Sequence, residues 1–134
     1  MTAFVYSDAG IRKQQPVAVM WANYRAAQNL AKKIGCVVMD YFCDADKNRH
    51  NLEKMIGEIP RYGVDAVIVP GIASIAPGAK ECAHYIRKLQ SAGVKLYCVE
   101  FGPEDLFAQK EFDAMIRSFE RHGGNGNKAS EGNS

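Results

Sequence analysis

Hydrophobic and polar residues form two kinds of pattern along the chain. Short apolar runs bounded by turn residues predict strands, several of them buried on both faces. These runs cover residues 3–6, 36–42, 65–69 and 94–99. Between them, apolar residues recur at intervals of three and four, which predicts amphipathic helices. The helical pattern covers residues 16–34, 52–59, 79–92 and 106–122.

The strand and helix segments alternate from one end of the chain to the other. This order predicts an α/β fold, a three-layer α/β/α sandwich around a mostly parallel four-stranded sheet. Residues 64–100 organise it, because they read as strand, loop, helix and strand, which is a right-handed parallel unit. The loop at residues 70–78 follows the carboxyl end of its strand, where open α/β sheets place their binding sites. We therefore expect that loop to take part in function.

The length of 134 residues predicts one domain, which we place at residues 1–122. Residues 123–134 are rich in glycine and asparagine, and we expect a disordered tail there because they cannot bury enough surface to offset ordering. No apolar run approaches the roughly 20 residues that span a bilayer. The N-terminus lacks a signal-peptide pattern. A cytoplasmic protein without membrane association is therefore expected.

Charge and cysteine spacing restrict the chemistry further. A formal net charge of +2 neither requires nor excludes nucleic acid as a partner. Cys36, Cys82 and Cys98 lie in predicted apolar elements, as buried thiols of a reducing compartment would. The cysteines and histidines lack the spacing of a zinc site, and no glycine-rich phosphate loop follows the first strand. No metal and no cofactor are expected.

Polar residues follow the first two predicted strands. Ser7 could be a nucleophile, but the sequence identifies no histidine or lysine as its general base. A serine whose hydroxyl only forms a hydrogen bond within a turn is therefore favoured. Asp40, Asp44 and Asp46 could hold Mg²⁺ at a strand end, although a solvated loop is favoured. Arg49 could bind phosphate bidentately, with an ordinary surface charge as the favoured alternative.

The loop at residues 70–78 has an unusual composition for a site position. It contains no charged residue, and Ser74 carries its only side-chain hydroxyl. Catalytic loops normally present acids, bases or cations. This loop therefore indicates either that chemistry is absent or that the surface docks onto another protein.

Taken together, residues 3–121 resemble the catalytic domain of the serine recombinases, the resolvase/invertase family, and especially its large-recombinase branch. The first strand of that family ends in Tyr-x-Arg-x-Ser, followed four residues later by a glutamine. Tyr6 and Gln14 match this pattern. Asp8 stands in place of the arginine and Gly10 in place of the nucleophilic serine.

Later segments extend the resemblance. Asp44, Arg49 and Leu52 fit the aspartate and the Arg-x-x-Leu pattern with which the family opens its next helix. Residues 119–121 read Phe-Glu-Arg, like the family's long dimerisation helix. The resemblance thus implies a homodimer through the final helix, and Gln14 and Arg49 as the residues left to bind phosphate or DNA.

The loop after the third strand departs from the family. It keeps the apolar frame around Ala73, but Ser74 and Pro77 replace the two arginines that cradle the scissile phosphate. Without the serine there is no attacking oxygen, and without the arginines most electrostatic stabilisation of phosphoryl transfer is lost. The sequence therefore predicts a degenerate domain, inactive in strand exchange, that regulates or binds an unidentified protein.

Two alternatives stay open. The chain could still associate with DNA, through phosphate contacts from basic residues at Arg12, Lys13, Arg25 and positions 47–49. It could instead be an unrelated α/β enzyme, or a binder of a small ligand or phosphate, that uses the strand-end crevice. Ser7, Asp44 and Arg49 would then form the site.

Overall fold

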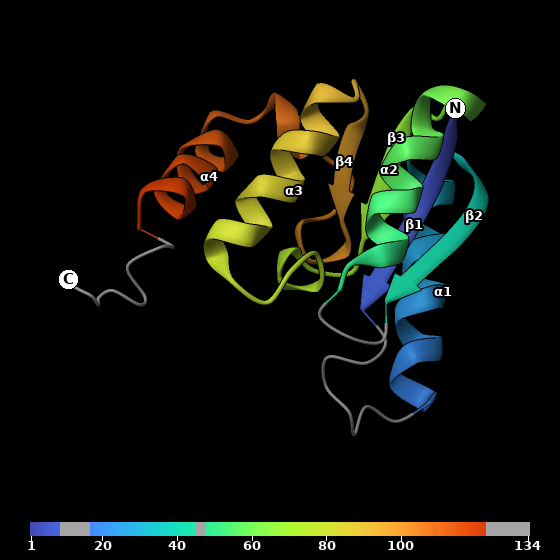
Figure 1. Cartoon of the computed structure of the whole chain (residues 1–134). Coiled ribbons are helices and arrows are strands. Elements are labelled where there is room, and N and C mark those ends of the chain that lie inside the picture. Colours follow the sequence, from blue (N-terminus) through green and yellow to red (C-terminus); the bar gives the residue numbers. More distant parts are fainter. Residues whose placement is uncertain (9–16, 45–47, 123–134) are drawn as a thin grey trace.

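The computed structural model describes residues 1–8, 17–44 and 48–122 (Figure 1). The predicted tail at residues 123–134 lies outside them. The strands are β1 (Thr2–Asp8), β2 (Val37–Asp44), β3 (Ala66–Val69) and β4 (Lys95–Cys98). The α-helices are α1 (Val17–Lys33), α2 (His50–Tyr62), α3 (Ala79–Ser91) and α4 (Lys110–His122). Short 3₁₀ turns at Ile72–Ser74, Val99–Phe101 and Leu106–Ala108 complete the described elements.

The strands form one sheet in the order β2-β1-β3-β4, and every pair in it is parallel. Helix α1 packs on one face, α2 and α3 pack on the other, and α4 lies against α3 (Figure 1). The α/β/α sandwich predicted from the sequence is therefore confirmed. The chain runs from β1 outward to β2 and then returns to β3 on the other side of β1. This places the topological switch point between β1 and β3.

The central strands are buried on both faces, as their apolar runs predict. Along β1, Ala3 and Val5 belong to the core beneath α1, whereas Phe4 and Tyr6 belong to the core beneath α2 and α3. This division follows from the two-residue period of a strand, which sends successive side chains to opposite faces. The same alternation decides which residues of β1 can share a site.

The structure corrects two predicted boundaries. The final helix was expected from residue 106, but Leu106–Ala108 is a 3₁₀ turn and α4 begins at Lys110. The Asp105 carboxylate caps this turn by accepting from the backbone N–H of Phe107 at 3.1 Å, and the backbone becomes extended at Gln109 (φ −108°, ψ 128°), which separates the turn from α4. The second strand also continues beyond residue 42 to Asp44. That extension brings Asp44 to the carboxyl end of the sheet beside Asp8.

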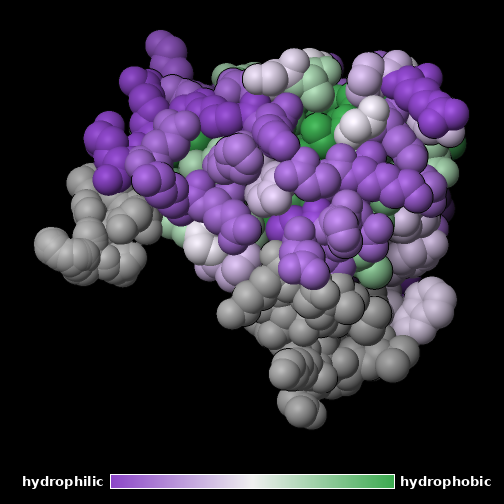
Figure 2. All heavy atoms as spheres, viewed as in Figure 1, coloured by the Kyte–Doolittle hydropathy of each residue, from purple (hydrophilic) through white to green (hydrophobic). Residues whose placement is uncertain are grey.

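Hydrophilic side chains cover most of the face formed by α2, α3 and α4, with hydrophobic residues visible in small patches (Figure 2). Cys36, Cys82 and Cys98 are buried as expected, whereas Cys43 is exposed. No described helix has the length and apolar character to cross a membrane. No cluster of three or more His, Cys, Asp or Glu side chains among the described residues could hold a metal ion.

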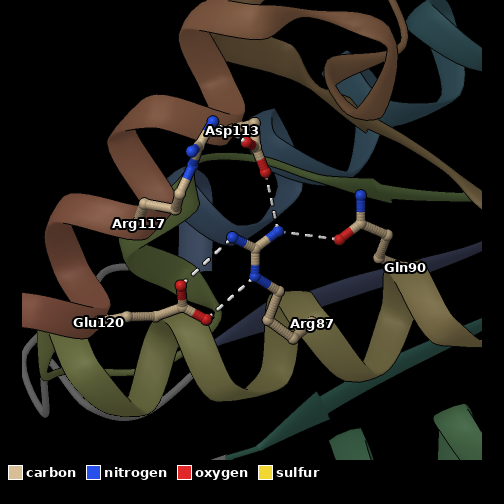
Figure 3. A network of polar contacts seen from close by, with 5 residues as sticks. All are labelled: Arg87, Gln90, Asp113, Arg117 and Glu120. Atoms are coloured by element: carbon tan, nitrogen blue, oxygen red, sulfur yellow. Dashed lines mark hydrogen bonds and ion pairs between the residues drawn. The ribbon is translucent and has the colours of Figure 1, made fainter.

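Helix α4 is attached to α3 by both apolar and charged contacts. Phe112 and Ile116 are buried in the core that α3 covers. Arg87 of α3 forms a bidentate ion pair with Glu120, at 3.0 and 3.2 Å, and its third nitrogen donates to Asp113 at 3.0 Å (Figure 3). One guanidinium thus binds two carboxylates that lie two turns apart on α4 and holds that helix against α3.

We expect an Arg87→Gln variant to melt roughly 1–4 °C below the wild type near neutral pH, with the difference fading in acid. Hydrogen bonds from Arg87 lower the pKa of Asp113 and of Glu120 in the folded state. Their stabilising contribution is therefore present above their ordinary pKa of about 4 and is lost as the pH falls through the lowered values. Circular dichroism melts from about pH 7 to about pH 2.5 measure the difference.

Arg25→Gln, at an exposed position on α1, provides the control and should follow the wild-type profile at every pH. If the difference in melting temperature between Arg87→Gln and the wild type stays the same at about pH 2.5, the carboxylates of α4 do not stabilise the fold through Arg87.

Candidate functional site

The candidate site lies where the parallel strands end. Asp8 and Asp44 pair in the register of β1 and β2, so both carboxylates stand at the same edge of the sheet. Strand β3 ends beside them at Val69, and the loop after it begins at Pro70. This edge is the position at which open α/β sheets usually bind ligands.

A buried polar network joins three separate elements at this edge. The Tyr6 hydroxyl donates to Oδ2 of Asp44 at 2.7 Å and accepts from a guanidinium NH of Arg49 at 2.8 Å. Tyr6 and Arg49 are 0% exposed and Asp44 is 3% exposed. Charged groups are expensive to bury unless they are paired and hydrogen-bonded, so these three side chains stabilise the fold only as a unit.

Asp44 also caps helix α2 from a distance. Its Oδ1 accepts from the backbone N–H of Asn51 at 2.8 Å, and its Oδ2 accepts from that of Leu52 at 3.0 Å. Arg49 occupies the N-cap position and makes no side-chain cap bond, so the carboxylate of Asp44 satisfies the first turn in its place. The interpretation of Asp44 as part of a solvated loop is therefore wrong.

Arg49 holds the loop that follows β3. The terminal nitrogen of Arg49 that donates to Tyr6 also donates to the backbone carbonyls of Ser74 and Ile75, at 3.4 Å each. Arg49 has φ +54°, and it is the only non-glycine residue with positive φ among those that the structure describes. Such a conformation persists where surrounding contacts fix it. The interpretation of Arg49 as an ordinary surface charge is wrong.

The network favours structure over acid–base chemistry. Burial raises the pKa of Tyr6 far above its ordinary value, and the hydrogen bond to Asp44 raises it further. The hydroxyl therefore stays protonated across the neutral range and continues to donate to Asp44. A group with so high a pKa is a poor general base or nucleophile near neutral pH.

The positions that the resemblance singled out are only partly brought together. Asp8 is half-buried at the end of β1, and the half-buried Ser74 meets Arg49 through its backbone carbonyl. Ala73 and Pro77 are exposed on the same loop. Gly10 and Gln14 lie outside the described residues. The loop after β3 thus reaches this edge, as predicted, and contacts it through its backbone.

Ser7, Asp44 and Arg49 do not form one crevice, so that grouping is wrong. Ser7 follows Tyr6 on β1 and therefore points to the opposite face of the sheet. There it lines a pocket of about 390 Å³ on the α1 side, together with Tyr24 and Tyr41. The carboxyl edge of the sheet consequently has a charged side beneath α2 and an uncharged, aromatic side beneath α1.

The aromatic side was missed because its helix residues fit an apolar stripe. The sequence assigns Trp21 and Tyr24 to the buried face of the first helix, but Trp21 is 56% exposed and Tyr24 is half-buried. Both lie near the start of α1, whose first turns extend past the strand ends (Figure 1). A stripe that starts beyond the sheet cannot all be core, and this could have indicated a pocket.

No protein-family model and no curated protein matches the chain in sequence. Solved structures match its fold. A resolvase family site-specific recombinase from Streptococcus pneumoniae has a TM-score of 0.74 at 20% identity, over 88% of this chain and 84% of that chain. The N-terminal catalytic domain of TP901-1 integrase has a TM-score of 0.70 at 11% identity, over 90% and 92%.

A third match is the C-terminal catalytic domain of ISC1926 TnpA, an IS607-like serine recombinase. It has a TM-score of 0.63 at 15% identity, over 90% of this chain and 97% of that chain. At these identities the likeness establishes the fold and nothing further. It confirms the predicted serine-recombinase-like fold.

We expect Tyr6→Phe to lower the free energy of unfolding by about 1–3 kcal/mol, because it leaves Asp44 and Arg49 buried without the hydroxyl between them. Urea denaturation near neutral pH measures the change. Tyr62→Phe is the matched control, since Tyr62 is 49% exposed, and it should stay within about 0.5 kcal/mol of the wild type. Equal stability of the two variants would contradict the role given to the Tyr6 hydroxyl.

Proposed function

We propose that this chain is a degenerate serine-recombinase-like domain that does not exchange DNA strands and acts as a regulatory or protein-interaction module. One observation carries the proposal. Arg49, the residue that the resemblance leaves to bind a phosphate, is fully buried, and its guanidinium donates inward to Tyr6, Ser74 and Ile75. Because this side chain is fully buried, it exposes no edge that could form a bidentate pair with a DNA phosphate.

The chemistry of strand exchange supports the same conclusion. A serine oxygen must attack phosphorus, and preorganised cations must stabilise the charge that develops on the phosphoryl oxygens. The sequence has Gly10 at the nucleophile position, and Asp8, Ser74 and Pro77 at the arginine positions. Asp8 also lies at the end of β1, so this edge has a carboxylate where the family has a phosphate-binding arginine. A carboxylate repels a phosphate, because both groups are negatively charged.

The packing of α4 indicates which side of this helix is free to contact a partner protein. Its buried side chains Phe112 and Ile116 pack into the core of the domain, and Arg87 holds the helix in that position. A homodimer through α4, as the resemblance implies, would use the outward side of that helix. Exposed residues on that side include Lys110, Ala114 and Arg117. We therefore expect contact through a polar helix surface, with the helix still docked.

DNA association is the second interpretation, and the basic residues considered for it differ in their exposure to solvent. Arg25 is exposed on α1 and is available to a phosphate, whereas Arg49 is buried. Arg12, Lys13 and Lys47 lie outside the described residues. If DNA binds, we place the contact at the basic residues of α1 rather than at Arg49.

We expect the purified chain to produce no covalent protein–DNA adduct and no nicking when incubated with a pool of supercoiled plasmids that carry random inserts. The reaction is stopped with SDS, so that a phosphoserine linkage would keep protein on DNA. The matched variant Gly10→Ser returns the hydroxyl alone and should also be inactive, because the arginine positions remain unfilled. An SDS-resistant adduct formed by the wild-type chain would overturn the proposal.

A further inference from the structure

The pocket on the α1 side of the sheet lies at the topological switch point. Ser7 of β1 and Pro70, directly after β3, both line it, and these two strands flank the switch. Its volume of about 390 Å³ falls within the range of pockets that hold small molecules. The buried network of Tyr6, Asp44 and Arg49 lies on the other face and contributes no lining residue to it.

Aromatic rings dominate the walls of this pocket. Tyr24 of α1 stacks on Tyr41 of β2, with ring centroids 4.0 Å apart and planes inclined by 24°. Trp21 meets Tyr24 edge to face at 5.6 Å. Trp21 is nevertheless 56% exposed, although an indole usually buries its large apolar surface. An exposed tryptophan beside a hollow indicates a surface that a ligand covers.

The polar groups of the pocket are few and neutral. The Ser7 hydroxyl and the Asn23 amide are side chains that can both donate and accept hydrogen bonds, and both line the pocket. None of the described lining residues carries a charge. A phosphate, a carboxylate or an ammonium group would therefore find no counterion among these described residues. The pocket suits an uncharged ring with hydrogen-bonding groups on its edge.

We propose that this pocket binds a neutral planar heterocycle of the nucleobase class. The face of the ring would stack on the exposed indole of Trp21, since bases stack readily on aromatic side chains, and Tyr24, whose plane is inclined by 75° to that of Trp21, would meet its edge. Its edge would bond to Asn23 and Ser7, because an amide side chain matches the paired donor and acceptor of a base edge. The sugar and any phosphate would remain outside, in solvent. This inference stands apart from the absence of strand exchange, because it uses none of the residues around Arg49.

Fluorescence tests this directly, because Trp21 is the only tryptophan in the chain. We expect a saturable change in Trp21 emission on titration with at least one of adenosine, guanosine, cytidine and thymidine. A stacked single ring should give dissociation constants between about 10 µM and about 1 mM. Free N-acetyltryptophanamide in the same titration corrects for absorption by the probe.

Titration with single-stranded decamers of each base distinguishes a base on a nucleic-acid strand from a free nucleoside as the ligand. Tighter binding of a decamer than of its nucleoside assigns the pocket to a base on a strand, and equal binding assigns it to a free nucleoside. Either result supports the nucleobase class. Benzoate, a charged ring of similar size, should bind at least about fivefold more weakly than the best nucleoside, because the described lining residues offer it no counterion.

Paired variants locate the site. Asn23→Ala should weaken binding of the best nucleoside at least about fivefold, as expected for the loss of a hydrogen bond to the ring edge. Asn29→Ala is the matched control, because Asn29 is exposed on the same helix and does not line the pocket. Ser7→Ala replaces the first variant if circular dichroism shows Asn23→Ala unfolded. No saturable change with any nucleoside or decamer, or equal binding by pocket and control variants, would overturn the inference.

Discussion

The structure depends on a single buried hydroxyl, that of Tyr6. It donates to a carboxylate and accepts from a guanidinium, and all three side chains are nearly or fully removed from solvent. Each charge would be costly to bury alone. Together they connect β1, the end of β2, the start of α2 and the loop after β3. The network therefore holds these described elements together at the carboxyl edge of the sheet.

This constraint also limits what the edge can do. A cation at the end of a parallel sheet could meet a phosphate, but here the arginine side chain is fully buried. Fold and chemistry are separable in this way, because function belongs to a site rather than to an architecture. The alternation of β1 then gives the edge two unlike sides. Tyr6 joins the ionic network beneath α2, and Ser7 opens on the aromatic pocket beneath α1.

Much of the fold could be predicted from the sequence, because strand and helix periods are local signals. The alternating elements and the parallel sheet followed from them. The burial of Asp44 and Arg49 could not be predicted, since it depends on Tyr6, which lies 38 and 43 residues away in the chain. The exposure of Trp21 was missed because it depends on where the sheet ends beneath α1, and the only signal for it was an apolar stripe longer than the strands that it covers. The start of α4 was missed because the backbone becomes extended at Gln109, although the apolar spacing continues across that position.

The most direct test of the central claim is arginine-specific labelling of the native protein with phenylglyoxal, read by peptide mass spectrometry. The reagent needs access to the guanidinium. We expect Arg49 to stay unmodified while the exposed Arg25 reacts, with no change in the labelling of Arg49 when DNA is added. Arg49 should react once the protein is unfolded in urea. Rapid labelling of Arg49 in the native protein, suppressed by DNA, would instead identify Arg49 as an accessible phosphate-binding residue.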